Sequence, residues 1–116
     1  MSKDKIYTQA LSWTAENFVS ANAVIQMKDR DVGKIVGKGV TEFKQWVAAV
    51  PAEFTTIIEC KDGRYRVTFK DFIALWKGPG RQPVTQANFL NQLNEKCRSM
   101  AADLYTYMKQ ASKDEW

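Results

Sequence analysis

Histidine is absent from this sequence of 116 residues. Histidine is the usual general base near neutral pH and a frequent metal ligand. It is also the base that activates serine and cysteine nucleophiles in many enzymes. Aspartate and glutamate remain for acid–base chemistry, but the sequence alone does not locate pairs of them in space. We therefore expect a protein that is not an enzyme and that holds no cofactor and no metal ion.

Cysteine is scarce as well, with only Cys60 and Cys97 in the chain. Their separation fits no zinc-binding or redox motif. Both fall on faces that the patterns below predict to be buried, which favours reduced thiols that act as small hydrophobic side chains. A disulfide between them is the alternative if the protein works outside the cytoplasm.

Long apolar runs are missing too, since none approaches the roughly 18 residues that a membrane-spanning helix needs. The charged start, residues 1–5, is followed by no signal-peptide apolar stretch. This predicts a cytoplasmic protein if Met1 is the true start, and a periplasmic or surface protein if a leader was removed. The 17 basic and 13 acidic residues give a net charge of +4, a mild surface bias rather than a concentrated nucleic-acid footprint.

The residues that are present are typical of one folded domain. Hydrophobic residues make up 45% of the chain and charged residues 26%, which are ordinary values for a globular protein. A chain of this length can bury a core without help from disulfides or metals. We therefore expect residues 1–116 to form a single α+β domain.

Two segments have the period of an amphipathic helix. The first runs from Lys3 to about Ser20, with Ser2 as its N-cap, and the second from Thr85 to about Ser112. At about 40 Å the second helix is longer than the expected strands, so its last turns should extend beyond the sheet. The apolar stripe of the first helix is Ile6, Tyr7, Ala10, Leu11, Trp13, Thr14 and Phe18. The stripe of the second is Phe89, Leu90, Leu93, Cys97, Met100, Ala101, Leu104 and Met108.

Two hairpins are expected between the helices. The first pairs residues 23–28 with 34–40 across a loop that ends in glycine. Its facing pairs are Met27 with Ile35 and Ile25 with Gly37. In this register Gly37 and Gly39 face the helices, where the missing side chains would let a helix approach closely.

The second hairpin joins residues 54–60 to 64–72 through Asp62-Gly63, a favoured pair for a type I′ turn because both positions need positive φ. The predicted buried face has Cys60 opposite Tyr65, Ile58 opposite Val67 and Thr56 opposite Phe69. The other face has Glu59 opposite Arg66, Ile57 opposite Thr68 and Thr55 opposite Lys70. Residues 76–83 read as a loop. The expected fold is therefore an α+β four-stranded antiparallel meander with both helices on one face.

Three short motifs are better explained as structure than as binding sites. Residues 33–39 lack the spacing of a phosphate-binding P-loop, and they alternate like a strand. Residues 29–33 lack the third ligand and the distal glutamate of a calcium loop, so a hairpin turn is expected. Residues 78–81 are interpreted as a turn rather than as an anion site.

Three segments resemble a bacterial family, the domain of unknown function numbered 4468, which has a TBP-like fold. They are Ala10–Phe18, Gly33–Gly39 and Lys61–Val67, and the resemblance covers roughly residues 3 to 75. It implies a β-α-β-β-β-β-α domain, often in exported proteins, with no known catalytic residue or ligand. Members of the family have a strand before the first helix, and this chain begins almost at the helix. Either the domain has lost that strand or the chain is truncated.

The sheet face away from the helices is the predicted interaction surface. Its candidate residues are Val24, Val36, Lys38, Ile57, Arg66, Thr68 and Lys70, together with Val40. The preferred hypothesis is a protein-interaction or self-associating module, and the alternative is a nucleic-acid-binding domain that uses the basic face. A minor-groove saddle inserts aromatic wedges, which this face lacks. Binding to DNA or RNA that weakens steeply with salt would favour the alternative.

The edge of the last strand is the second candidate surface. Without the family's first strand, residues 64–72 would present unpaired backbone groups, which proteins seldom leave bare over a long stretch. We expect a second copy of the chain or a strand of another protein to fill it. Thr68 is taken as an outward donor at this edge, with Val67 or Phe69 as the alternatives.

Overall fold

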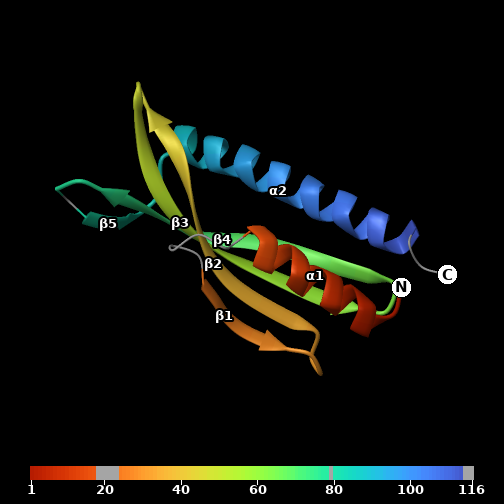
Figure 1. The fold of residues 1–116 in the computed structure, drawn as a ribbon. Helices are drawn as coiled ribbons and strands as arrows, with labels where there is room; N and C mark the ends of the chain where they lie inside the picture. Colours follow the sequence, from red (N-terminus) through yellow and green to blue (C-terminus); the bar gives the residue numbers. More distant parts are fainter. Residues whose placement is uncertain (18–23, 79, 114–116) are drawn as a thin grey trace.

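The computed structural model describes residues 1–17, 24–78 and 80–113, except for the side chains of residues 24–27 (Figure 1). Its elements are α1 (Lys3–Asn17), β1 (Val24–Asp29), β2 (Lys34–Gln45), β3 (Ala48–Lys61), β4 (Arg64–Trp76), β5 (Gly80–Pro83) and α2 (Ala87–Lys113). The strands form one antiparallel sheet in chain order. The sheet has five strands where the sequence predicted four.

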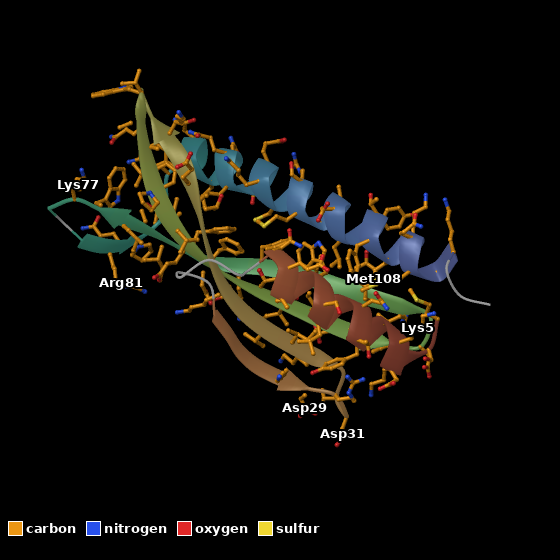
Figure 2. The ribbon with its side chains drawn as sticks, viewed as in Figure 1. Lys5, Asp29, Asp31, Lys77, Arg81 and Met108 are labelled. Carbon is orange, nitrogen blue, oxygen red and sulfur yellow. The ribbon has the colours of Figure 1, made fainter. Side chains whose placement is uncertain are left out.

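The β1–β2 hairpin closes through the expected turn. The Asp29 carboxylate accepts hydrogen bonds from the N–H groups of Asp31 (3.1 Å) and Val32 (3.2 Å). Gly33 follows with a φ of 79°, and a Cβ there would lie 2.6 Å from the Cys60 carbonyl oxygen. Figure 2 shows Asp29 and Asp31 at this turn. Their carboxylates therefore belong to a hairpin turn, as expected.

The register of this hairpin was predicted only in part. Ile25 pairs with Gly37, as expected, but Met27 pairs with Val36 and not with Ile35. A bulge between Ile25 and Met27 accounts for the error, because one extra residue in β1 shifts every later pair. Sequence alternation does not reveal such an insertion.

The β3–β4 hairpin has all six predicted facing pairs. On the helix side, however, the two strands differ in burial. The β3 residues of these pairs, Thr56, Ile58 and Cys60, are buried. Their partners on β4, Tyr65, Val67 and Phe69, are only half-buried, so the expectation of a fully buried β4 face is wrong. The physical reason is that this half of β4 has no strand on its outer side.

Both strands of the β2–β3 hairpin extend well beyond their predicted ends. They meet at Trp46 and Val47, which are 93% and 95% exposed. Figure 1 shows this hairpin rising past the end of α2. Phe43 anchors its base, because the ring lies 4.5 Å from that of Phe89 in α2, between ring centroids. The molecule is elongated as a result, with principal extents of 52 × 23 × 23 Å.

A bulge in β4 lets the sheet cover both ends of α2. Asp71 has a φ of 57°, and the β3–β4 register shifts between Glu53 and Thr55. The shift changes which β4 residues face the helices, from odd numbers before it to even numbers after it. Phe72, Ala74 and Trp76 therefore join the core below the start of α2. That core cluster is Phe43, Val50, Ala52, Ala74, Phe89 and Leu93, with Phe72, Trp76 and Val84 beside it.

A second core cluster joins α1 to the far half of α2. Its buried members are Ile6, Tyr7, Ala10, Trp13, Ile35, Ile58, Cys60, Leu104 and Met108, with Leu11, Tyr65, Val67 and Met100 packed against them. In the second half of α2, Leu104 and Met108 are buried in this cluster, and Figure 2 shows Met108 near the end of the helix. Phe18, expected in this core, lies outside the described residues.

Candidate interaction site

The open sheet face brings the predicted surface residues together in rows across the strands. One row is Val36, Ile57 and Thr68, and the next is Lys38, Thr55 and Lys70. Val24 pairs with Lys38 at the β1 end of the second row, although its side chain is not described. Val40 lies further along β2 on the same face. The predicted residues therefore form one contiguous surface.

This face is basic toward the β3–β4 turn. A shallow hollow of about 270 Å³ at this end spans the edge of β4 and is lined by Glu59, Lys61, Arg64, Arg66 and, from the helix side, Tyr65. Arg66 forms an ion pair with Glu59 at 2.8 Å, and both side chains are well exposed, so the pair adds little stability. Among the described open-face positions of β2, β3 and β4 none is aromatic.

Every second residue of β4 directs its backbone N–H and C=O groups toward the outer edge of the sheet. The Cys60 N–H donates to the Gly33 carbonyl at 2.7 Å, so the backbone of Cys60 points toward β2. Cys60 and its partner Tyr65 are therefore a non-bonded pair of the β3–β4 ladder, where bonded and non-bonded pairs alternate. It follows that the N–H and C=O groups of Tyr65, Val67 and Phe69 point outward. Thr68, taken from sequence as an edge donor, points inward to Ile57.

This free edge is bounded at both ends. At the turn, Gly63 donates its N–H to the Met1 carbonyl at 2.8 Å. At the other end, the Val84 N–H donates to the Phe72 carbonyl at 2.9 Å, and β5 pairs with β4 from Ile73 onward. Between these ends no described strand pairs with the outer side of β4. The gap is long enough for a strand of about five to seven residues, at roughly 3.3 Å per residue.

A groove runs beside the free edge, between β4 and α2. It is an open hollow of about 340 Å³ lined by Val67, Phe69, Asn94, Cys97, Arg98 and Ala101. Cys97 lies at its base and is 7% exposed. Arg98 lies at the rim, where it pairs with Glu95 at 2.6 Å. The groove thus has an apolar floor and a polar rim.

The α2 side of this groove was missed in the sequence. The helical stripe included Cys97 and Ala101 as core residues, and nothing in the pattern indicated that a groove would open beside them. Asn94 and Arg98 looked like ordinary exposed positions. The sequence did indicate the free edge of residues 64–72. It did not indicate that α2 would lie beside that edge, because this placement depends on the whole fold.

The fifth strand was also missed. Residues 80–83 were predicted as loop, but they pair with Ile73–Trp76. Arg81 lies on this strand (Figure 2). It forms an ion pair with Glu53 of β3 at 2.5 Å. Residues 80 and 81 therefore belong to the sheet, where the sequence predicted a turn. Because β5 covers only the second half of β4, it sets the end of the free edge that lies away from the β3–β4 turn.

The two cysteines are free and buried, as predicted. Burial raises the pKa of each thiol from 9.0 to about 11. At neutral pH both are therefore protonated, poor nucleophiles and poor metal ligands. In the part of the chain that the structure describes, no group of three or more acidic or cysteine side chains is placed to hold a metal ion.

None of the described helices has the length and apolar character needed to cross a membrane. The curled antiparallel sheet with an N-terminal and a C-terminal helix on one face defines a TBP-like α+β protein. A family model described as a domain of unknown function (DUF4468) with TBP-like fold matches residues 1–74. The chain belongs to the DUF4468 family.

Two solved structures share the fold over nearly the whole chain. A TBP-like protein from Parabacteroides distasonis ATCC 8503 is 14% identical, with a TM-score of 0.77 over 93% of this chain and 85% of that one. A DUF4468 family protein from Bacteroides ovatus ATCC 8483 is 16% identical, with a TM-score of 0.68 over 96% of this chain and 78% of that one. Among curated proteins none matches this chain.

Proposed function

We propose that this protein is a non-catalytic interaction module that binds an extended segment of a partner protein along the free edge of β4. The observation that carries the proposal is the bounded stretch of outward N–H and C=O groups at Tyr65, Val67 and Phe69. Strand addition at such an edge gains affinity from main-chain hydrogen bonds and specificity from pockets for alternate side chains. The groove beside α2 supplies those pockets.

The open sheet face supports a nucleic-acid-binding function less well. Glutamates lie among its basic residues, and Arg66 is already paired with Glu59. The described face offers no aromatic side chain to stack on bases or to wedge between them. A free sheet edge, in contrast, presents regularly spaced backbone donors and acceptors that an added strand can pair with.

Peptides selected from a random library test the proposal. Bound peptides should shift the backbone amide resonances of Tyr65, Val67 and Phe69 in an NMR titration. Val67→Pro removes one outward N–H without breaking the β3–β4 ladder, so we expect binding to weaken at least about tenfold. Val67→Thr keeps the N–H and the branched shape, and it is the matched control.

The thermal midpoints of both variants are measured first, because the comparison requires folded protein. Peptides that bind Val67→Pro as tightly as the unmodified protein would contradict the proposal. Peptides that shift only resonances of the open sheet face would contradict it as well.

A further inference from the structure

The charges beside the free edge point to the chemistry of its partner, and this inference rests on the function proposed above. Between Tyr65, Val67 and Phe69, the other residues of this part of β4 place their side chains on the open sheet face. These residues are Arg64, Arg66, Thr68 and Lys70, and three of them are basic. Arg66 has Glu59 at 2.8 Å, and no acidic residue lies opposite the other two in the β3–β4 register. A partner strand that pairs here must face this basic row.

The other side of the same edge is apolar. The side chains of Tyr65, Val67 and Phe69 turn toward the helices and are half-buried. Val67 and Phe69, with Cys97 and Ala101, form the floor of the groove beside α2. Alternate residues of an added strand would place their side chains in this groove. Apolar side chains fit its floor, because they would complete the burial of the β4 residues.

A second copy of the chain is a poor occupant of the edge. Two β4 strands related by a two-fold axis would pair antiparallel. In three registers, at least two of the outward residues of each strand lie opposite outward residues of the other. These registers bring Arg64 opposite Lys70, Arg66 opposite Arg66, or Arg66 opposite Lys70. Like charges directly opposite each other destabilise a sheet. The protein's own strand therefore lacks the charge that this edge requires.

We infer that the free edge of β4 binds a strand of another protein in which acidic and apolar residues alternate. The acidic side chains lie over Arg64, Arg66 and Lys70, and the apolar side chains enter the groove between β4 and α2. The bound segment is about five to seven residues long, since Met1 and Val84 close the two ends of the gap.

Two fluorescein-labelled peptides of eight residues test this inference, one of alternating Val and Glu and the other of alternating Val and Lys. Fluorescence anisotropy should show the Val–Glu peptide binding at least about tenfold more tightly at low salt. Its advantage should shrink as salt screens the charges. Amide shifts at Tyr65, Val67 and Phe69 should accompany the binding.

Charge-reversal variants locate the effect. Arg64→Glu combined with Lys70→Glu should reverse the preference between the two peptides. Lys77→Glu makes a single charge change at the exposed β4–β5 turn, at the opposite end of the molecule (Figure 2). It should leave the preference unchanged.

The outcomes separate the two proposals. Suppose that both peptides bind equally, shift the amide resonances of the edge and lose affinity in Val67→Pro. This result would overturn the inference of an acidic partner but support strand addition at the edge. Tight binding of the Val–Glu peptide that survives in Val67→Pro would overturn both, because simple charge attraction would explain it. Tighter binding of the Val–Lys peptide would also overturn the inference.

Discussion

At the scale of single residues, the ring of Phe54 explains why glycine occupies position 39. Gly39 pairs with Phe54, and a Cβ on Gly39 would lie 2.8 Å from the tip of the Phe54 ring. The ring itself is 2% exposed and is surrounded by Phe69 and Phe72. The sequence predicted that Gly39 leaves room on the helix side, and it is this ring that occupies the room. A helix was expected there instead.

We predict that Gly39→Ala destabilises the protein by about 1–3 kcal/mol, because the buried Phe54 ring has little space to move away. The free energy of unfolding, measured with urea, tests this. In a Phe54→Leu background the same change should cost clearly less. Equal costs in the two backgrounds would show that the ring is not the obstacle.

Phe54 also replaces Phe69 as the residue whose loss should cost most in this region. If Phe69 were fully buried, as the strand pattern predicted, Phe69→Ala would cost about 3–5 kcal/mol as a cavity in a packed core. Phe69 is only half-buried at the groove, so that estimate belongs to Phe54→Ala. Urea unfolding of the two alanine variants should therefore rank Phe54→Ala as the more destabilised. The reverse order would contradict the packing described here.

The two thiols should make stability fall in alkaline solution. Their pKa is about 11 in the folded protein and close to 9.0 when exposed. The unfolded chain therefore loses these protons first, so stability is unaffected below about pH 8 and decreases as the pH rises from 9 to 11. Urea unfolding between pH 7 and 11 measures the decrease. A Cys60→Ala/Cys97→Ala variant should show a smaller one, and an identical slope would refute the assignment.

At the scale of elements, packing and a polar contact between Trp13 and Asp103 hold α1 and α2 together. The buried Trp13 indole donates its N–H to the Asp103 carboxylate of α2 at 2.8 Å. Asp103→Ala removes this acceptor, and we expect a loss of about 1–3 kcal/mol. Asp103→Asn keeps an oxygen at the same position and should lose less. Unfolding by urea compares the variants, and an Asp103→Ala variant as stable as the unmodified protein would mean that the bond contributes nothing.

The elements differ in how far the sequence predicted them. The β3–β4 hairpin was predicted pair by pair, because Asp62-Gly63 determines the turn and a two-residue turn determines the register. The extension of β2 and β3 was missed because residues 44–49 are exposed on both faces and show no alternation. The fifth strand was missed because four residues with glycine and proline resemble a loop. It exists only because β4 is there to pair with it.

At the scale of the whole molecule, the like charges along the β4 edge predict a monomer. Sedimentation velocity at high micromolar concentration should show one species at the monomer mass. Lys70→Glu places opposite charges across two of the three antiparallel registers, facing Arg64 in one and Arg66 in the other. This variant should shift toward a dimer, and the shift should weaken with salt. A wild-type dimer that is lost in the Val67→Pro variant would contradict this prediction. It would show instead that the chain associates with itself through this edge.

The sequence by itself determined the helix stripes, the turn chemistry and the face of each strand near the turns, because these follow from periods and pairings a few residues apart. It also determined that the open face is basic and lacks aromatic residues. The tertiary structure decided which residues lie beside the free edge. Cys97 and Ala101 line one groove with Val67 and Phe69 because α2 packs back against the helix side of the sheet, a placement that no local pattern specifies. A bulge, a short strand and a groove between distant segments arise from long-range packing, which local patterns do not encode.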